Sequence, residues 1–196
     1  MRSTTWRRSR ERSGRAHGSR ALSDLLTFGH GTASPDELVA LLKNAGVEQV
    51  VDVRRFPGSR RNPEMSNEAM GTWLPDAGID YLWEPRLGGR RSVPKDQDDE
   101  VDGWWRVKAF RAYAAHMRTD EFREGLRVLL ERMDHGRTAV MCSESLWWRC
   151  HRRLISDAVM LLHGRTVSHL GHDGRLTEHE PPPSATVADD GLHYDG

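Results

Sequence analysis

The segment LLTFGHGTASPDELVALLKNAGVEQVVDV, residues 25–53, holds one strand–helix–strand unit, and this unit decides the fold class. Its apolar start ends abruptly at a glycine, as a short buried strand does. Ser34 and Glu37 are spaced as a capping box, and Pro35 fits the first position of a helix. The helix is expected to stop at a glycine, and Val47–Val53 follows as the second strand.

Strands and helices alternate through the rest of the chain. In chain order, the predicted elements are a helix at 66–77, a strand at 79–84, helices at 104–117 and 119–135, a strand at 137–142, a helix at 149–164 and a strand at 165–170. This alternation favours parallel pairing, with helices on both faces of the sheet. The sequence therefore predicts a three-layer α/β sandwich, Rossmann-like, with a mainly parallel sheet of about five strands.

We expect one folded domain between two loose ends. A length of 196 residues suits a single core. Residues 1–24 are rich in Arg, Ser and Gly and predict a disordered head, while residues 171–196, rich in Pro, Gly and acidic residues, predict a flexible tail. The α/β domain is therefore assigned to residues 25–170. No segment resembles a secretory signal or a membrane span, so we expect a cytoplasmic location and no membrane partner.

The basic residues are nearly all arginines. The chain has 29 basic and 29 acidic residues, and because only Lys43, Lys95 and Lys108 are lysines, 26 are arginines. The codon usage of a GC-rich genome accounts for many of them, though less well for those near the predicted strand ends. The planar guanidinium group binds phosphate and carboxylate in a fixed geometry, so the arginines near the strand ends favour an anionic ligand.

The residues best suited to chemistry follow the predicted strands. In open parallel sheets, ligands bind beyond the carboxyl ends of the strands. The segments that leave the strands at this edge are 29–31, 52–61, 84–91, 142–145 and 168–172. They contain His, Asp, Arg, Gly-Gly and Cys residues, which predicts a polar pocket built from several loops.

Three stretches resemble a known family. TFGHGTASPDELVALLKNAGVEQVVDVRRFPGSRR, LGGRR and MCSESLWWRCHRRLISDAVMLLHGRTVSHL occur in this order and resemble the bacterial family called domain of unknown function 488. The resemblance covers residues 25–170. It implies an α/β fold with a polar pocket at the strand ends, and it implies no particular reaction.

Both cysteines, Cys142 and Cys150, follow the predicted strand at 137–142. A lasting disulfide is not expected in the cytoplasm. Cys142 could be a thiolate nucleophile in an anion-binding loop or a buried pocket wall, although Arg149 follows it at a longer interval than such loops use. Cys142, Cys150 and His151 are weak metal candidates, because adjacent residues on a helix point about 100° apart. No metal and no cofactor is assigned.

Two carboxylates and two histidines are candidates for acid–base catalysis. Asp52 and Glu144 both follow apolar strands, so either could be a base or a nucleophile in a partly dry pocket, or Asp52 could form a structural ion pair with Arg54. His30 lies between two glycines at a strand end, and His151 begins a helix. Imidazole exchanges protons near neutral pH, so both are proton-transfer candidates.

The remaining candidates would bind the substrate. Arg54, Arg60 and Arg152 are the expected anion clamps, and glycines near them would let the backbone approach a ligand. The full set is Gly29, Arg54, Pro57, Ser59, Arg60, Gly88, Gly89, Arg90, Arg149 and Arg152.

The sequence favours an enzyme that hydrolyses or transfers a group on a phosphorylated or nucleotide-like substrate. The expected partner is a phosphate-bearing small molecule or a nucleic acid, and the oligomeric state stays open. One alternative is a non-catalytic nucleic-acid-binding module, since arginines and tryptophans could bind phosphates and stack on bases. Another is a Cys-dependent sulfur-transfer protein or a metal-binding protein.

Overall fold

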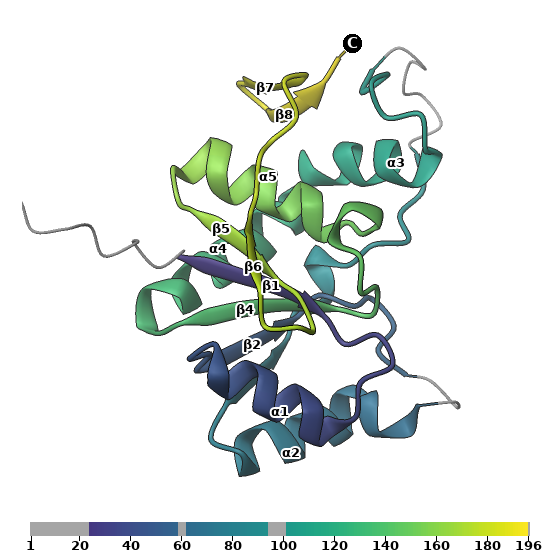
Figure 1. Cartoon of the computed structure of the whole chain (residues 1–196). Coiled ribbons are helices and arrows are strands. Elements are labelled where there is room, and N and C mark those ends of the chain that lie inside the picture. The colour runs from purple at the N-terminus through teal and green to yellow at the C-terminus, as the bar shows by residue number, and fades with distance from the viewer. Residues whose placement is uncertain (1–23, 59–61, 94–100, 196) are drawn as a thin grey trace, which may run out of the picture.

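The computed structural model describes residues 24–58, 62–93 and 101–195, and these form the expected three-layer α/β sandwich (Figure 1). The main sheet has six strands in the order β3-β2-β4-β1-β5-β6. The strands are β1 (Leu25–Gly29), β2 (Gln49–Asp52), β3 (Asp80–Trp83), β4 (Thr138–Cys142), β5 (Val167–Leu170) and β6 (Leu176–Glu178). The first five are parallel and correspond to the five predicted strands, whereas β6 is antiparallel to β5.

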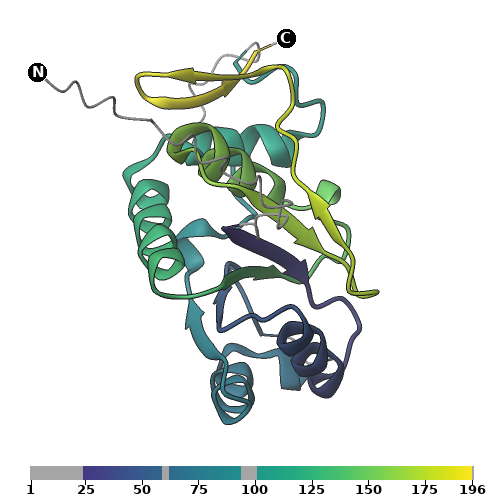
Figure 2. The same ribbon diagram turned by 60° about the vertical axis from the view of Figure 1, so that its left-hand side comes forward.

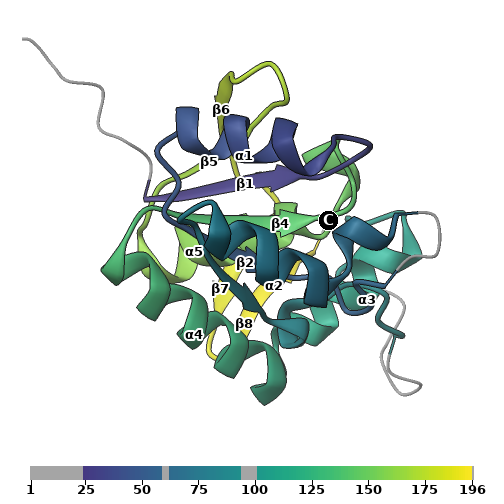
Figure 3. The same ribbon diagram turned by 90° about the horizontal axis from the view of Figure 1, so that it is seen from below.

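Helices cover both faces of this sheet (Figure 3). They are α1 (Pro35–Asn44), α2 (Asn67–Asp76), α3 (Lys108–Met117), α4 (Asp120–His135) and α5 (Arg152–His163), with short 3-10 turns η1 (Pro63–Met65), η2 (Pro85–Leu87) and η3 (Trp147–Arg149). Successive strand residues point to opposite faces, so Leu26 packs with α1 and α2 while Leu25 packs with α3, α4 and α5. Within the described ranges, no helix combines the length and the apolar composition needed to cross a bilayer.

The start of α1 has the predicted cap. The Ser34 side chain accepts a hydrogen bond from the backbone N–H of Glu37, and the Glu37 carboxylate accepts one from the backbone N–H of Ser34 at 2.8 Å. Pro35 occupies the first turn. Gly46 follows the helix with a φ of 68°, which suits glycine because the left-handed region is unfavourable for other residues.

The segment after residue 170 differs from the loose tail that its composition predicts. It contains β6 and a hairpin of β7 (Ala185–Ala188) and β8 (Gly191–Tyr194). Figure 2 shows the hairpin lying across the outer side of α3 and α5. Leu192 and Tyr194 are buried in the core on that side, so two well-placed side chains attach a segment that is otherwise polar. The predicted head lies almost wholly outside the described residues.

The neighbouring strands β1 and β4 mark the switch point of the sheet. Gly29 at the end of β1 is in register with Cys142 at the end of β4. The chain leaves β1 toward α1 on one face and leaves β4 toward α5 on the other face. Loops that depart to opposite faces leave a crevice between them, and the cavity described next lies there.

Candidate functional site

A cavity of about 840 Å³ lies at the carboxyl ends of the parallel strands. Gly31 borders it after β1, Arg54 to Phe56 after β2, and Gly89 and Arg90 after β3. The start of α3 and most of the segment 142–151 complete the wall. Loops from four strands therefore meet at one place, whereas the predicted pocket had five loops. No residue of the fifth predicted segment, 168–172, lines the cavity.

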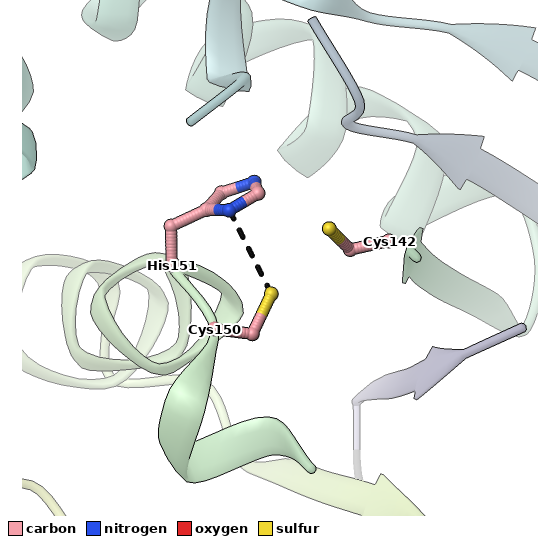
Figure 4. Close-up of side chains that lie close together, drawn as sticks. All are labelled: Cys142, Cys150 and His151. Carbon is pink, nitrogen blue, oxygen red and sulfur yellow. Dashed lines mark hydrogen bonds between the residues drawn. The ribbon is translucent and has the colours of Figure 1, made fainter. Parts of the chain in front are cut away.

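Cys142, Cys150 and His151 form a cluster in the wall of this cavity (Figure 4). The two Sγ atoms and one ring nitrogen all lie within 4.8 Å of one another. The side chains of Cys150 and His151 would diverge if both residues were helical, as the sequence predicts. Cys150 is instead extended, with φ −124° and ψ 148°, and α5 begins only after His151. Adjacent side chains can therefore converge on one point.

The imidazole of His151 has a backbone partner at one ring nitrogen and open space beside the other. Its Nε2–H donates to the carbonyl oxygen of Val53 at 3.3 Å, which leaves a lone pair on Nδ1. Nδ1 lies 3.6 Å from the Sγ of Cys150. A Cβ atom added to Gly89 would lie 2.8 Å from Nδ1, so only glycine leaves this side of the ring free.

The two thiols perturb each other. A hydrogen bond from Cys142 lowers the pKa of Cys150 well below its usual value, and the charges of His151 and Arg152 lower it further. The same contact raises the pKa of Cys142, and burial adds to this effect. The opposite directions of the two shifts favour a single negative charge on the pair of thiols.

Arginines give the cavity a positive rim. Arg54 lies in the wall, but its guanidinium is bonded to the Asp52 carboxylate, with 2.6 Å between Nη2 and Oδ2. No carboxylate within the described ranges forms an ion pair with Arg55, Arg90 or Arg149, which also line the cavity. Among the described residues that line the wall, Glu144 is the only one with a carboxylate. The rim therefore carries an excess of positive charge.

Asp52 and His30 lie behind this wall and contact Arg54. The Asp52 carboxylate is fully buried and accepts hydrogen bonds from Arg54 and from the hydroxyl of Tyr81 at 2.8 Å. His30 Nε2 accepts from Arg54 Nη1 at 3.3 Å. Burial, and then the charge of Arg54, lower the pKa of His30. In this structure both residues hold Arg54 in place, and neither lines the cavity.

Arg152 and three other predicted ligand contacts are packing residues. The Arg152 side chain is 1% exposed and donates to the carbonyl oxygen of Glu144, so it supports the loop after β4 from beneath. A Cβ atom on Gly29 would lie 1.9 Å from the same carbonyl oxygen, and one on Gly88 would lie 2.8 Å from the backbone of Arg55. Pro57 is buried and does not line the cavity. Ser59 and Arg60 lie outside the described residues.

Aromatic side chains also border the cavity. Trp148 is one of the tryptophans that were expected to stack on bases, whereas Phe56, Phe110 and Tyr113 were not predicted. Phe56 is 62% exposed and Trp148 is 49% exposed, and both border the cavity. Phe110 and Tyr113 of α3 also line it, with the Tyr113 ring 5.0 Å from that of His151. The apolar stripe of α3 gives no sign of this role, because the same stripe packs against the core.

A second polar cluster is buried away from the cavity. Thr27 Oγ1 contacts His169 Nδ1 at 2.7 Å, and His169 Nε2 contacts His179 Nδ1 at 2.9 Å. His179 Nε2 reaches the Asp157 carboxylate at 2.7 Å, and the Tyr194 hydroxyl donates to the same carboxylate at 2.8 Å. Polar atoms this deeply buried require such partners, so the cluster attaches the C-terminal segment to β1 and α5.

The fold and the cavity define a class of protein: an open α/β sheet with an arginine-rich pocket beside two cysteines and a histidine. The sequence model of the family described as "Domain of unknown function DUF488" matches residues 34–159. This match covers more than half of the chain, and the chain belongs to that family. The comparison with curated proteins and the comparison with solved structures find no match.

Proposed function

We propose that this protein is an enzyme that hydrolyses or transfers a group on a phosphorylated, nucleotide-like substrate bound in the cavity. The observation that carries the proposal is the combination of arginines that form no ion pair with a described carboxylate, exposed aromatic rings and a Cys-Cys-His cluster around one opening. In open, mainly parallel α/β sheets, ligands bind in the crevice beyond the carboxyl ends of the strands, which is where this cavity lies.

The charge of the rim supports an anionic substrate. Arg55, Arg90 and Arg149 have no described carboxylate partner, whereas Arg54 is already neutralised by Asp52. Guanidinium groups bind phosphate through paired hydrogen bonds, which are stronger than those between neutral groups. A phosphate group would therefore supply an anionic partner that the described residues do not provide for these three arginines.

The size and the aromatic rim support a nucleotide-like substrate. A volume of about 840 Å³ is within the range of roughly 300–1,000 Å³ in which small-molecule ligands bind. Phe56 and Trp148 expose ring surface at the opening, and such surface binds planar bases by stacking. A substrate with a phosphate and a planar ring would use both features.

Isothermal titration of the full chain with nucleoside mono-, di- and triphosphates, phosphosugars and short oligonucleotides tests the proposal. For the best ligand, Arg149→Gln should weaken binding by about 10- to 100-fold, as expected for loss of a charge-assisted hydrogen bond. Trp148→Ala should weaken the binding of nucleotides and leave the binding of phosphosugars unchanged. Arg127→Gln is the matched control, because Arg127 is an exposed arginine on α4 that does not line the cavity.

The outcomes separate an enzyme from a binding module. Conversion of the bound nucleotide, followed by mass spectrometry and abolished when the cavity arginines are replaced, supports the enzyme. Tight binding of oligonucleotides without any conversion would instead support the nucleic-acid-binding alternative. If no compound binds, or if Arg149→Gln binds as tightly as the wild type, the proposal is wrong. The cytoplasmic location stays a prediction, and a reducing compartment would keep both thiols free.

A further inference from the structure

We propose that Cys142, Cys150 and His151 form a binding site for one Zn²⁺ ion, with a fourth coordination position open to the cavity. The ion binding rests on the three side chains alone. Only the use of the open position, for a water molecule or a substrate oxygen, rests on the proposed function.

The three ligand atoms are spaced for a tetrahedral ion. In zinc sites the Zn–S distance is about 2.3 Å and the Zn–N distance about 2.0–2.1 Å. A tetrahedral angle then separates sulfur and nitrogen by roughly 3.6 Å, and the Sγ of Cys150 lies 3.6 Å from Nδ1 of His151. Sγ of Cys142 lies within 4.8 Å of both atoms, so it has to move by no more than about 1 Å to reach the separation of about 3.6–3.8 Å between ligand atoms of a tetrahedral ion.

The histidine already has the outer partner of a metal ligand. Ligating imidazoles almost always donate their other ring N–H to a carbonyl or a carboxylate, which fixes the nitrogen that binds the metal. His151 Nε2 contacts the carbonyl oxygen of Val53 at 3.3 Å, so Nδ1 is the free nitrogen and it faces the sulfur atoms. Gly89 leaves space beside this nitrogen.

The number and type of ligands match a zinc site that keeps one position open. Three protein ligands of the Cys₂His type plus one water molecule occur in catalytic zinc sites, whereas structural sites are closed by four protein ligands. All three residues also border the cavity. Two thiolates and a neutral imidazole would neutralise Zn²⁺, which suits a site where both cysteines are buried.

A second group of side chains could also hold a metal ion, but one of its carboxylates is already paired with an arginine. Asp102, His193 and Asp195 also lie within 4.8 Å of one another. The Asp102 carboxylate, however, already binds the guanidinium of Arg118 through both oxygens, at 3.1 and 2.8 Å. That group contains only oxygen and nitrogen, so spectroscopy distinguishes the two groups.

Cobalt substitution of the full, tag-free chain tests the site. The protein is stripped of metal under reducing conditions and titrated with Co²⁺. We expect saturation at one ion per chain, the intense visible bands of four-coordinate cobalt, and a near-ultraviolet sulfur-to-cobalt band with the intensity of two thiolates. Zn²⁺ should displace cobalt and bleach the spectrum, as expected from its higher affinity.

Variants assign the ligands. Cys142→Ser and Cys150→Ser should each halve the sulfur-to-cobalt band at saturation. Loss of a group that hydrogen-bonds to a metal ligand weakens metal binding by about 10- to 100-fold. Because His151 would be a ligand itself, His151→Gln should weaken cobalt binding by more than this. Ser143→Ala, beside Cys142 in the same wall, is the control and should keep the full spectrum. Circular dichroism checks that each variant is folded. If a variant does not fold, the cobalt spectrum of the wild-type protein still tests the site.

The proposal is overturned if wild-type protein with both thiols reduced shows no sulfur-to-cobalt band. It is also overturned if folded Cys150→Ser keeps the full band. Failure of the proposed function looks different, because it would leave the cobalt spectrum intact while no nucleotide or phosphosugar binds. Conversely, nucleotide binding that depends on Arg149 in a protein without the cobalt band would retain the proposed function and reject the zinc site.

Discussion

His169 should make the protein less stable in mild acid, by an amount that follows from its environment. The ring is 3% exposed and stacks on Trp147 with 3.9 Å between ring centres. Burial is the main cause that lowers its pKa from 6.5 to about 3. Below pH 6.5 the unfolded chain takes up a proton that the folded chain refuses, so stability falls as the pH decreases from 6.5 toward 3. Each pH unit within this window costs about 1.36 kcal/mol of the free energy of unfolding. At pH 5, about 1.5 units below 6.5, the protein should therefore have lost about 2 kcal/mol.

Urea denaturation at pH 7 and pH 5 measures this effect. His169→Gln removes the titrating ring, so the difference in the free energy of unfolding between the two pH values should shrink by about 2 kcal/mol. This holds whatever stability the variant loses at pH 7. His135→Gln, an exposed histidine on α4, is the control, because it removes a ring without touching the buried cluster. If His169→Gln keeps the pH dependence of the wild type, the ring is not held neutral in the folded protein.

Three substitutions test other parts of the structure. Asp52→Ala should lower the free energy of unfolding by about 3–5 kcal/mol, because it leaves the buried Arg54 guanidinium without a counter-charge; a much smaller loss in urea denaturation would show that the pair is solvated. Gly29→Ala places a Cβ atom 1.9 Å from the carbonyl oxygen of Glu144, so we expect a lower thermal midpoint and weaker nucleotide binding. An unchanged midpoint would mean that the loop after β4 moves freely. Ser34→Ala should cost about 1 kcal/mol by removing the cap of α1, while nucleotide binding stays at the wild-type level, and equal stability of the two proteins would contradict the capping box.

Local sequence patterns account for most of the fold. The capping box at Ser34 and the apolar runs of β1, β2 and β4 are decided by neighbouring residues, so they were predictable. The strands β6, β7 and β8 were not, because each has only three or four residues and nearly all those of β6 and β7 are exposed. What holds this segment is Tyr194, whose hydroxyl binds Asp157 across 37 residues of sequence.

The position of the cavity was predictable, but the residues that line it were only partly so. Parallel strands bring their carboxyl ends to one edge, and the cavity lies there. The convergence of Cys150 and His151 depends on the helix beginning at Arg152 rather than at residue 149, and such boundaries are poorly determined by propensity. Whether an arginine such as Arg152 faces a cavity or supports a loop is decided by packing, which the sequence does not display.

The position of Tyr194 and His179 also has a consequence for synthesis on the ribosome. Both donate to Asp157 but follow it by 37 and 22 residues. At about 5–20 residues per second, roughly 2–7 seconds pass between the addition of Asp157 and the addition of Tyr194. During this interval the nascent chain carries a carboxylate without its donors, in a position that the finished protein seals from water. A chain that stops early in the C-terminal segment should therefore be a substrate for proteases rather than a stable fragment.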